Sequence, residues 1–146
     1  MVQFEVRRET SLPAADAWSR LTDWKAHGQF IPLTTVTRSG AGVGSTFTAH
    51  SALGPFAFDD VMDVTVWEPP AGDQPGRCRI VKRGGVITGW AELVVTPTGA
   101  GSMVRWLEEA AIRRTGRVLD LPSRLASRVI FGRLVDGLLS VPDAGD

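Results

Sequence analysis

The sequence predicts an α+β fold in which a curved antiparallel sheet of about seven strands wraps around one long C-terminal helix. Three observations support this fold class. An alternating segment opens the chain, a run of short β-rich segments follows a helical stretch, and the last segment has helical periodicity. A sheet must bury one face, and only the helices can cover it. Curvature then leaves a space between sheet and helix that side chains need not fill.

The first expected elements are a strand and a short pair of helices. In residues 2–11 apolar and polar residues alternate, which indicates a half-buried strand. Apolar spacing and an early proline predict a helix over 13–24. His27 and Gly28 break this helix, and a short second turn is expected around 29–31.

A meander of antiparallel strands and a long helix follow. Segments rich in Val, Thr, Phe and Ile alternate with turn signals rich in Gly and Pro. The helix is expected from about Asp120 to Val141, because a proline stands near its start and another just past its end. The six strands are expected at 33–39, 44–51, 56–68, 77–83, 86–96 and 102–113.

Length and composition exclude several classes of protein. The 146 residues suit one domain, 1–146, with a core of its own. The 16 Lys and Arg balance the 16 Asp and Glu, which argues against a nucleic-acid-binding domain, since such domains are usually strongly basic. Cys78 is the only cysteine and forms no internal disulfide. Neither a signal peptide nor a transmembrane run is expected, so the sequence predicts a cytoplasmic protein without integral membrane association.

Short motifs along nearly the whole chain point to a known superfamily. They lie at residues 12–18, 21–27, 30–32, 42–47, 66–70 and 98–102. In this order and spacing they resemble the START-related helix-grip superfamily (SRPBCC), which includes polyketide cyclases/dehydrases and lipid-transfer proteins. The sequence is most similar to bacterial polyketide-cyclase-like members. The resemblance implies a helix-grip fold with a hydrophobic cavity between the sheet and the C-terminal helix.

Two ionisable side chains are candidates for acid–base catalysis. In the last strand, Glu108 shares a face with Val104 and Trp106, and this apolar face is expected to point inward. By the same alternation Lys82 points inward with Ile80. Desolvation would raise the pKa of an isolated Glu and lower that of a Lys, so either could transfer a proton. Alternatively, both reach solvent at the cavity mouth or pair as a structural salt bridge. A register shift of one residue would place Glu108 on the outer face.

Large apolar side chains on these elements are candidates for ligand binding. Aromatic residues at strand or helix spacing can line a pocket, although core packing is the alternative for each. Two aliphatic residues of the long helix join them. The ligand-binding candidates are Trp24, Phe30, Phe47, Phe58, Trp106, Leu125 and Val129.

No metal or cofactor is expected. Asp59, Asp60 and Asp63 are close in sequence, but on a strand Asp59 and Asp63 share one face while Asp60 points to the other. No histidine lies near them in sequence, and a solvated outer face explains these carboxylates better than a metal. His27 is expected to cap a helix end or lie at the surface.

The leading functional hypothesis is reversible binding of a hydrophobic or aromatic small molecule, lipid- or polyketide-like, in the internal cavity. A polyketide cyclase or dehydratase is the first alternative, with Glu108 or Lys82 moving a proton. A regulatory module that binds a partner protein is the second. Binding ranks first because no nucleophile–base pair is recognisable. The sequence does not determine the ligand or the oligomeric state.

Overall fold

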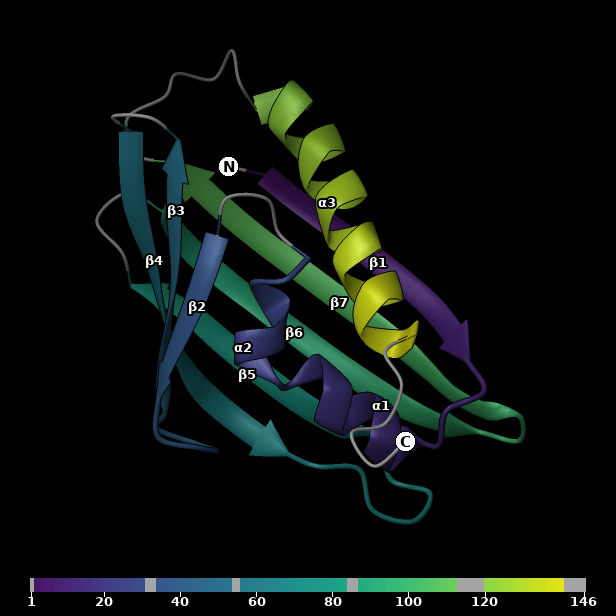
Figure 1. Ribbon diagram of the computed structural model, residues 1–146. Coiled ribbons are helices and arrows are strands. Elements are labelled where there is room, and N and C mark those ends of the chain that lie inside the picture. The colour runs from purple at the N-terminus through teal and green to yellow at the C-terminus, as the bar shows by residue number, and fades with distance from the viewer. Residues whose placement is uncertain (1, 31–33, 54–55, 84–86, 113–119, 141–146) are drawn as a thin grey trace.

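A computed structural model describes residues 2–30, 34–53, 56–83, 87–112 and 120–140 (Figure 1). The elements observed there follow the predicted order of strand, helical pair, six strands and long helix. In chain order they are β1 (Val2–Thr10), α1 (Ala14–Leu21), α2 (Trp24–His27), β2 (Thr34–Ser39), β3 (Thr46–Leu53), β4 (Phe56–Glu68), β5 (Gly76–Arg83), β6 (Ile87–Thr98), β7 (Gly101–Ile112) and α3 (Asp120–Ser140).

The strands form one seven-stranded antiparallel sheet in the order β1-β7-β6-β5-β4-β3-β2. From β2 to β7 each strand pairs with its successor in the chain, as a meander requires. The first strand then pairs with the last, from Val2 opposite Ala110 to Thr10 opposite Ser102. The predicted α+β fold with a curved antiparallel sheet is therefore confirmed.

The sheet is curled, and two local features of the long strands help it to bend. The register between β4 and β5 shifts between Val64 and Val66, which is the mark of a β-bulge. In β6, Gly89 has a φ of 140°. A Cβ placed there would lie 1.9 Å from the carbonyl oxygen of Glu109, so only glycine allows β6 and β7 to approach this closely.

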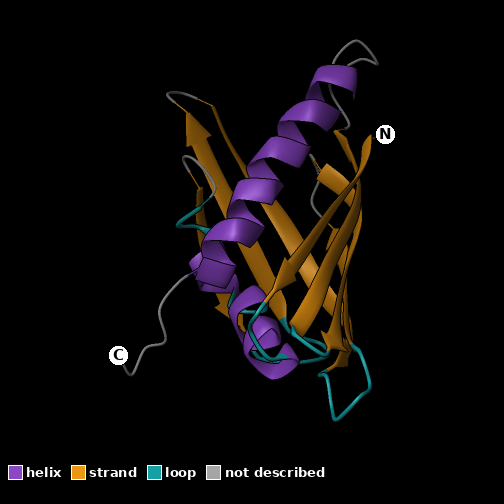
Figure 2. Cartoon of the chain, turned by 90° about the vertical axis from the view of Figure 1, so that its right-hand side faces the viewer, coloured by secondary structure: helices purple, strands orange, loops and turns teal. Residues whose placement is uncertain are grey.

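Helix α3 lies across the inner, concave side of the curled sheet, and α1 and α2 lie near its C-terminal end (Figures 1 and 2). Leu134, Val135 and Leu138 of α3 are almost completely buried in the core, as is Leu21 of α1. Among the described ranges, no helix combines the length and the hydropathy needed to cross a membrane.

The N-terminal helical pair is divided differently from the prediction. One helix was predicted over 13–24, but α1 ends at Leu21 and α2 begins at Trp24. The reason is Asp23, whose side chain accepts a hydrogen bond from a backbone N–H of α2 and so caps a new helix. The turn expected around 29–31 starts directly after α2, and its residue 31 lies outside the described ranges.

Candidate functional site

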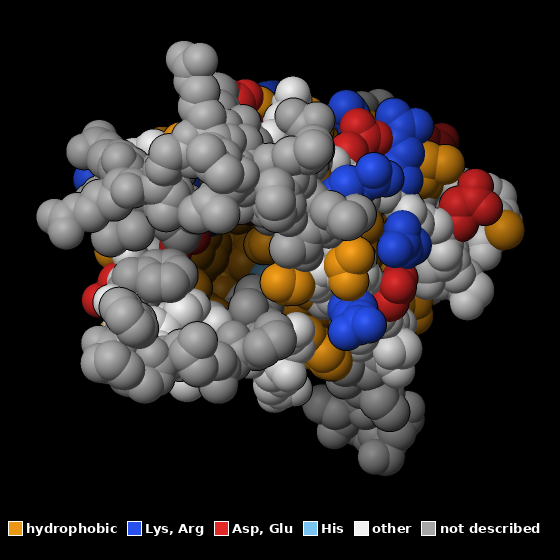
Figure 3. Space-filling view, turned by 90° about the horizontal axis from the view of Figure 1, so that it is seen from above, with side chains coloured by type: hydrophobic (Ala, Val, Ile, Leu, Met, Phe, Trp, Pro, Cys, Tyr) orange, Lys and Arg blue, Asp and Glu red, His pale blue; other side chains and the backbone are white. Residues whose placement is uncertain are grey.

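A small pocket lies between the inner face of the sheet, α2 and α3. We call it the inner pocket; its volume is about 60 Å³. A space-filling view from above shows hydrophobic side chains inside a hollow of the molecule (Figure 3). Apolar lining residues are Val36, Phe47, Ala49, Met62, Ile80, Ala91, Trp106 and Phe131, and polar ones are His27, Asp60, Lys82 and Glu108.

The volume limits what this pocket holds in the observed conformation. The pocket volume is about 60 Å³, whereas pockets for drug-sized ligands span roughly 300–1,000 Å³. A ligand of that size must therefore displace lining side chains or extend into the hollow above.

An ion pair joins two strands at one end of the inner pocket. Lys82 of β5 lies directly opposite Met62 of β4, so Asp60 is its diagonal neighbour on the same face. The Lys82 ammonium donates a hydrogen bond to the Asp60 carboxylate and lies 3.6 Å from the Met62 sulfur. The side chains of Lys82 and Asp60 are only 4% and 10% exposed, so this pair is removed from solvent.

Glu108 reaches the same end of the pocket from the far side of β6. Where β5 pairs with β6, Lys82 lies opposite Gly89. Where β6 pairs with β7, Glu108 lies opposite Ala91. Because both intervening residues are small, the longer side chains from β5 and β7 have room above β6. The Glu108 residue is 5% exposed and shares the inner face with Trp106, as the alternation in the sequence predicts.

Burial and charge set the protonation of this cluster. Burial raises the pKa of the Glu108 carboxyl, and the Asp60 charge adds to this. The Lys82 charge and the nearby Trp106 N–H, which does not reach hydrogen-bond distance, oppose it without reversing it, so the pKa stays above its ordinary value. Burial alone lowers the pKa of Lys82, but Glu108 and Asp60 reverse this and raise it. Desolvation lowers the pKa of Lys82 as expected, but the two carboxyl groups outweigh it. Lys82 remains an ammonium.

His27 is buried in the pocket wall, not exposed at the surface. It is 6% exposed, and its Nε2 lies 2.8 Å from the backbone oxygen of Leu21. A carbonyl can only accept, so Nε2 carries the proton and Nδ1 of the neutral ring is an acceptor. Burial lowers the pKa of His27 to about 4, so the imidazole is uncharged near neutral pH. Of the two expected positions the helix-end cap is the one observed, because Nε2 donates to the carbonyl of Leu21, the last residue of α1; the surface position was wrong, because α2 folds back over the sheet.

Two polar atoms in the pocket wall have no hydrogen-bond partner within the described part of the chain. They are Oδ1 of Asp60 and Nε1 of Trp106, and both are buried. Orphaned polar atoms in a folded interior are uncommon and costly. One is an acceptor and the other a donor, so the pocket offers both kinds of unused hydrogen-bonding capacity.

Aromatic rings support the pocket in two stacks. Phe47 lines it, and Trp24, which is not a lining residue, stacks flat on Phe47 with ring centroids 4.5 Å apart and an angle of 6°. Trp106 stacks on Phe131 of α3 at 5.8 Å, and Phe131 also contacts Phe4 of β1. These stacks connect the sheet to both helices that border the pocket.

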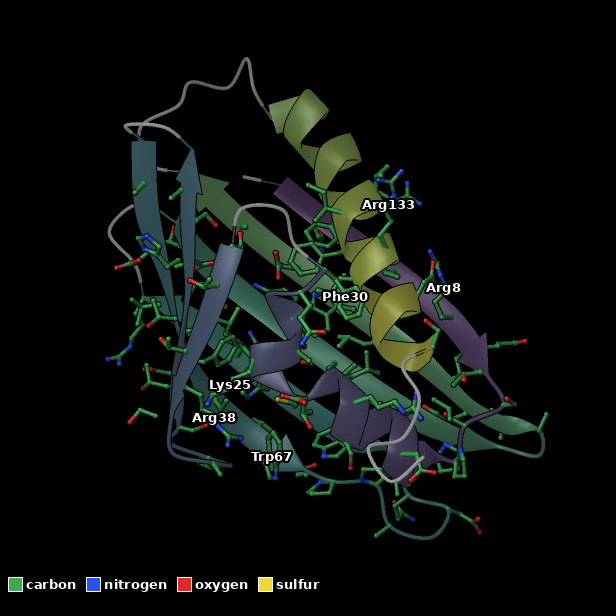
Figure 4. The ribbon with its side chains drawn as sticks, viewed as in Figure 1. Arg8, Lys25, Phe30, Arg38, Trp67 and Arg133 are labelled. Carbon is green, nitrogen blue, oxygen red and sulfur yellow. The ribbon has the colours of Figure 1, made fainter. Side chains whose placement is uncertain are left out.

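The structure brings only some of the ligand-binding candidates to the pocket. Phe47 and Trp106 line it, and Trp24 supports it from behind. Phe30 lies between α2 and α3 (Figure 4) and packs so closely on Gly137 that a Cβ there would meet its ring at 2.5 Å. The side chains of Phe58 and Leu125 lie outside the described residues, although Phe58 itself pairs with Ser51 between β3 and β4.

Val129 does not face the pocket, contrary to the prediction. Its side chain is 47% exposed and lines a groove on the opposite side of α3, together with Arg8 and Arg133 (Figure 4). Phe131 contacts the core two residues later, and two residues turn a helix by about 200°. The helix therefore presents Phe131 to the sheet and Val129 to solvent.

Several lining residues were not among the sequence candidates, and the most informative are Asp60, His27 and Phe131. Asp60 was assigned to a solvated face, although its alternation with the apolar residues Met62 and Val64 was a signal that it points inward. Asp59 is exposed and Asp63 partly exposed on the outer face, as expected. His27 and Phe131 carried no comparable signal. Among the described residues no group of His, Cys, Asp and Glu is arranged to hold a metal ion.

Comparison with known proteins relates the fold to solved structures. No family model matches the sequence. No curated protein matches it either. Solved structures do match, among them TTHA0849 from Thermus thermophilus, with a TM-score of 0.74 and 13% identity over 94% of each chain.

Two further matches are to proteins described by their activity. A STAR-related lipid transfer protein from Xanthomonas axonopodis matches with a TM-score of 0.70 and 18% identity, over 93% of this chain and 85% of that one. The Zhui aromatase/cyclase from Streptomyces sp. R1128 matches with a TM-score of 0.66 and 14% identity, over 94% and 92%. The chain has the helix-grip fold. Identities this low show a shared helix-grip fold and nothing finer about function.

Proposed function

We propose that this helix-grip protein binds a hydrophobic or aromatic small molecule, lipid- or polyketide-like, between the sheet and α3. The observation that carries the proposal is the inner pocket, whose walls are apolar and aromatic while three of its polar side chains, Asp60, Lys82 and Glu108, interact with one another and form its polar end. This is the usual design of a small-molecule site, in which apolar burial supplies affinity and a few polar groups fix orientation. The fold shared with a lipid transfer protein and an aromatase/cyclase supports it.

The aromatic stacks support the following roles for the binding candidates in this proposal. Trp106 and Phe47 contact the ligand directly, and Trp24 holds Phe47 in place. Leu125 and Phe58 stay in the proposal as further ligand contacts. Val129 is withdrawn, because it faces the outer groove.

The first experiment asks whether a ligand is present and whether the pocket holds it. Native mass spectrometry of the freshly purified protein is expected to show a co-purified small molecule. A hydrophobic fluorescent dye is expected to bind saturably and to quench the tryptophan fluorescence.

A matched pair of variants tests whether the dye binds in the inner pocket. Ala49→Phe fills the inner pocket, since Ala49 lines it, and is expected to abolish saturable dye binding. Ala52→Phe adds the same ring at an exposed position of the same strand and is expected to leave binding unchanged. The proposal fails if wild-type protein binds no dye saturably, or if Ala49→Phe binds it as wild type does.

The second candidate is an enzyme of the polyketide cyclase or dehydratase type. The observation that favours it is the buried Glu108 carboxyl beside the pocket, whose pKa is raised by burial, so that it holds a proton more readily than an exposed glutamate. Lys82 is not a base in this version, because it is held as an ammonium by Asp60. If Glu108 transfers a proton, Glu108→Gln lowers turnover of a polyketide-like substrate by about 10²–10⁴-fold and leaves its affinity almost unchanged. Equal turnover in the variant would exclude this role.

A further inference from the structure

We propose that the inner pocket selects ligands whose buried head group is an uncharged hydroxyl, as in an alcohol, a phenol or an enol, over carboxylates and amines. This inference rests on the proposed function, because it names the chemistry of the ligand bound at the same site. Three features of the polar end carry it: the sum of its charges, the two unpartnered polar atoms, and its burial.

The charges of the polar end balance when Glu108 holds its proton, the form that its burial favours. Lys82 and Asp60 form a buried ion pair, and Glu108 forms no ion pair within the described residues. His27 is the fourth ionisable group that lines the pocket, and it is neutral near pH 7. With Glu108 as the uncharged acid the cluster has no net charge. A charged head group would then be buried without a counter-ion, which is strongly unfavourable.

The unused hydrogen-bonding groups fit a hydroxyl. Trp106 Nε1 can only donate, and ionised Asp60 Oδ1 can only accept. A hydroxyl group accepts and donates at once, so one such group could satisfy both atoms. A carboxylate can only accept and would face the Asp60 oxygen as a second anion, and an ammonium can only donate and would face the Trp106 N–H.

The cluster also predicts which substitutions change the selectivity. Asp60 and Glu108 compete for one cation, Lys82, so one of the two carboxyl groups suffices to balance it. Asp60→Asn leaves Glu108 to ionise and pair with Lys82. Glu108→Gln leaves the existing pair with Asp60. Each single variant therefore keeps a neutral pocket, and only the double variant leaves Lys82 alone as a buried cation.

The test compares probes with one chain and three head groups. Displacement of a bound hydrophobic dye at pH 7 is measured with 1-dodecanol, dodecanoate and dodecylammonium. Wild type and both single variants are expected to bind the alcohol at least about tenfold more tightly than either ion, a difference of about 1.4 kcal/mol. The double variant Asp60→Asn/Glu108→Gln is expected to reverse the preference and to bind dodecanoate more tightly than dodecanol.

The matched control changes the same residue types on the outer face. Asp59→Asn/Glu109→Gln replaces the same two residue types, and Asp59 and Glu109 adjoin Asp60 and Glu108 on the opposite side of the sheet. This control is expected to keep the preference for the alcohol. A reversal in the control as well would mean that surface charge sets the preference and would overturn the inference.

A second measurement keeps the inference testable if the double variant does not fold. Carboxyl ¹³C NMR of wild type is expected to show Glu108 in its acid form at pH 6, where an ordinary Glu is almost fully ionised. An ionised Glu108 at that pH overturns the inference. If no probe binds saturably, the proposed function fails; if all bind but the carboxylate binds as tightly as the alcohol, only this inference fails.

Discussion

The two faces of the sheet carry the same kinds of ion pair under opposite conditions. On the inner face Lys82 pairs with Asp60, and the two side chains are 4% and 10% exposed. On the outer face the next residue, Arg83, pairs with Asp63 on the same two strands, and the Arg83 side chain is 62% exposed. One residue of β5 thus separates a desolvated pair from a solvated one. Removing one partner leaves a buried charge inside but a hydrated one outside.

Two glutamates show how the faces set opposite pKa directions. Burial raises the pKa of Glu92 on the outer face, but hydrogen bonds and charges from Arg77 and Arg79 outweigh it, and the net pKa is lowered. Burial also raises the pKa of Glu108, and there the single ammonium of Lys82, shared with Asp60, does not reverse it. The number of cations within reach, not the residue type, decides the direction.

The largest expected difference between the faces concerns stability. Lys82→Met leaves Asp60 without its cation and is expected to lower the free energy of unfolding by about 3–5 kcal/mol. Arg83→Met breaks the solvated pair with Asp63 and is expected to cost less than about 1 kcal/mol. Urea unfolding of both variants at pH 7 measures this. Equal losses would show that the two faces do not differ in the way their burial indicates.

A smaller difference is expected between the two histidines in acid. The pKa of buried His27 is lowered from 6.5 to about 4, so the unfolded chain binds a proton that the folded chain does not. The contribution of neutral His27 to the free energy of unfolding is therefore fully present above about pH 6.5. It falls by about 3 kcal/mol as the pH drops to about 4. His27→Gln is expected to remove this part of the pH dependence, and His50→Gln, at an exposed position of β3, to keep it. Thermal unfolding between pH 4 and pH 7 distinguishes the two.

The smallest expected effect concerns the two neighbouring glutamates of β7. The pKa of Glu108 is raised in the folded state, so its contribution to stability is complete below the ordinary value of 4.5 and is lost as the pH rises through the folded value. Glu108→Gln mimics the acid form of Glu108. Its free energy of unfolding is expected to stay within about 1.5 kcal/mol of that of wild type in acid and to rise relative to wild type as the pH rises. Glu109→Gln serves as the control. A gain of the same size in Glu109→Gln would contradict the assignment to the inner face.

The sequence by itself determined the order of elements and most of the strand faces. Alternation placed Glu108 with Trp106 and Lys82 with Ile80 on the inner side, because successive side chains of a strand point to opposite faces. Turn residues marked the ends of the strands, and Pro122 indicated where the long helix begins. These are local properties of the chain, so they can be read without knowing what lies across the fold.

Only the tertiary structure decided which of these residues meet. Glu108 and Lys82 come together because β6 lies between their strands and carries Gly89 and Ala91 there. The same is true of Asp60, which the pairing of β4 with β5 brings beside Lys82. The alternation along a strand shows on which face of the sheet a side chain lies. It does not show which residue lies beside it, since that depends on the order and register of strand pairing.

The helices show the same division. The periodicity of α3 indicated a broad apolar surface, but docking through Leu134 and Leu138 chose which part of it is buried and left Val129 outside. His27 follows a helix in the sequence and becomes a wall of the pocket only because α2 packs over the sheet. Burial is a property of the assembled layers, and it is burial that sets the charge of His27 and of Glu108.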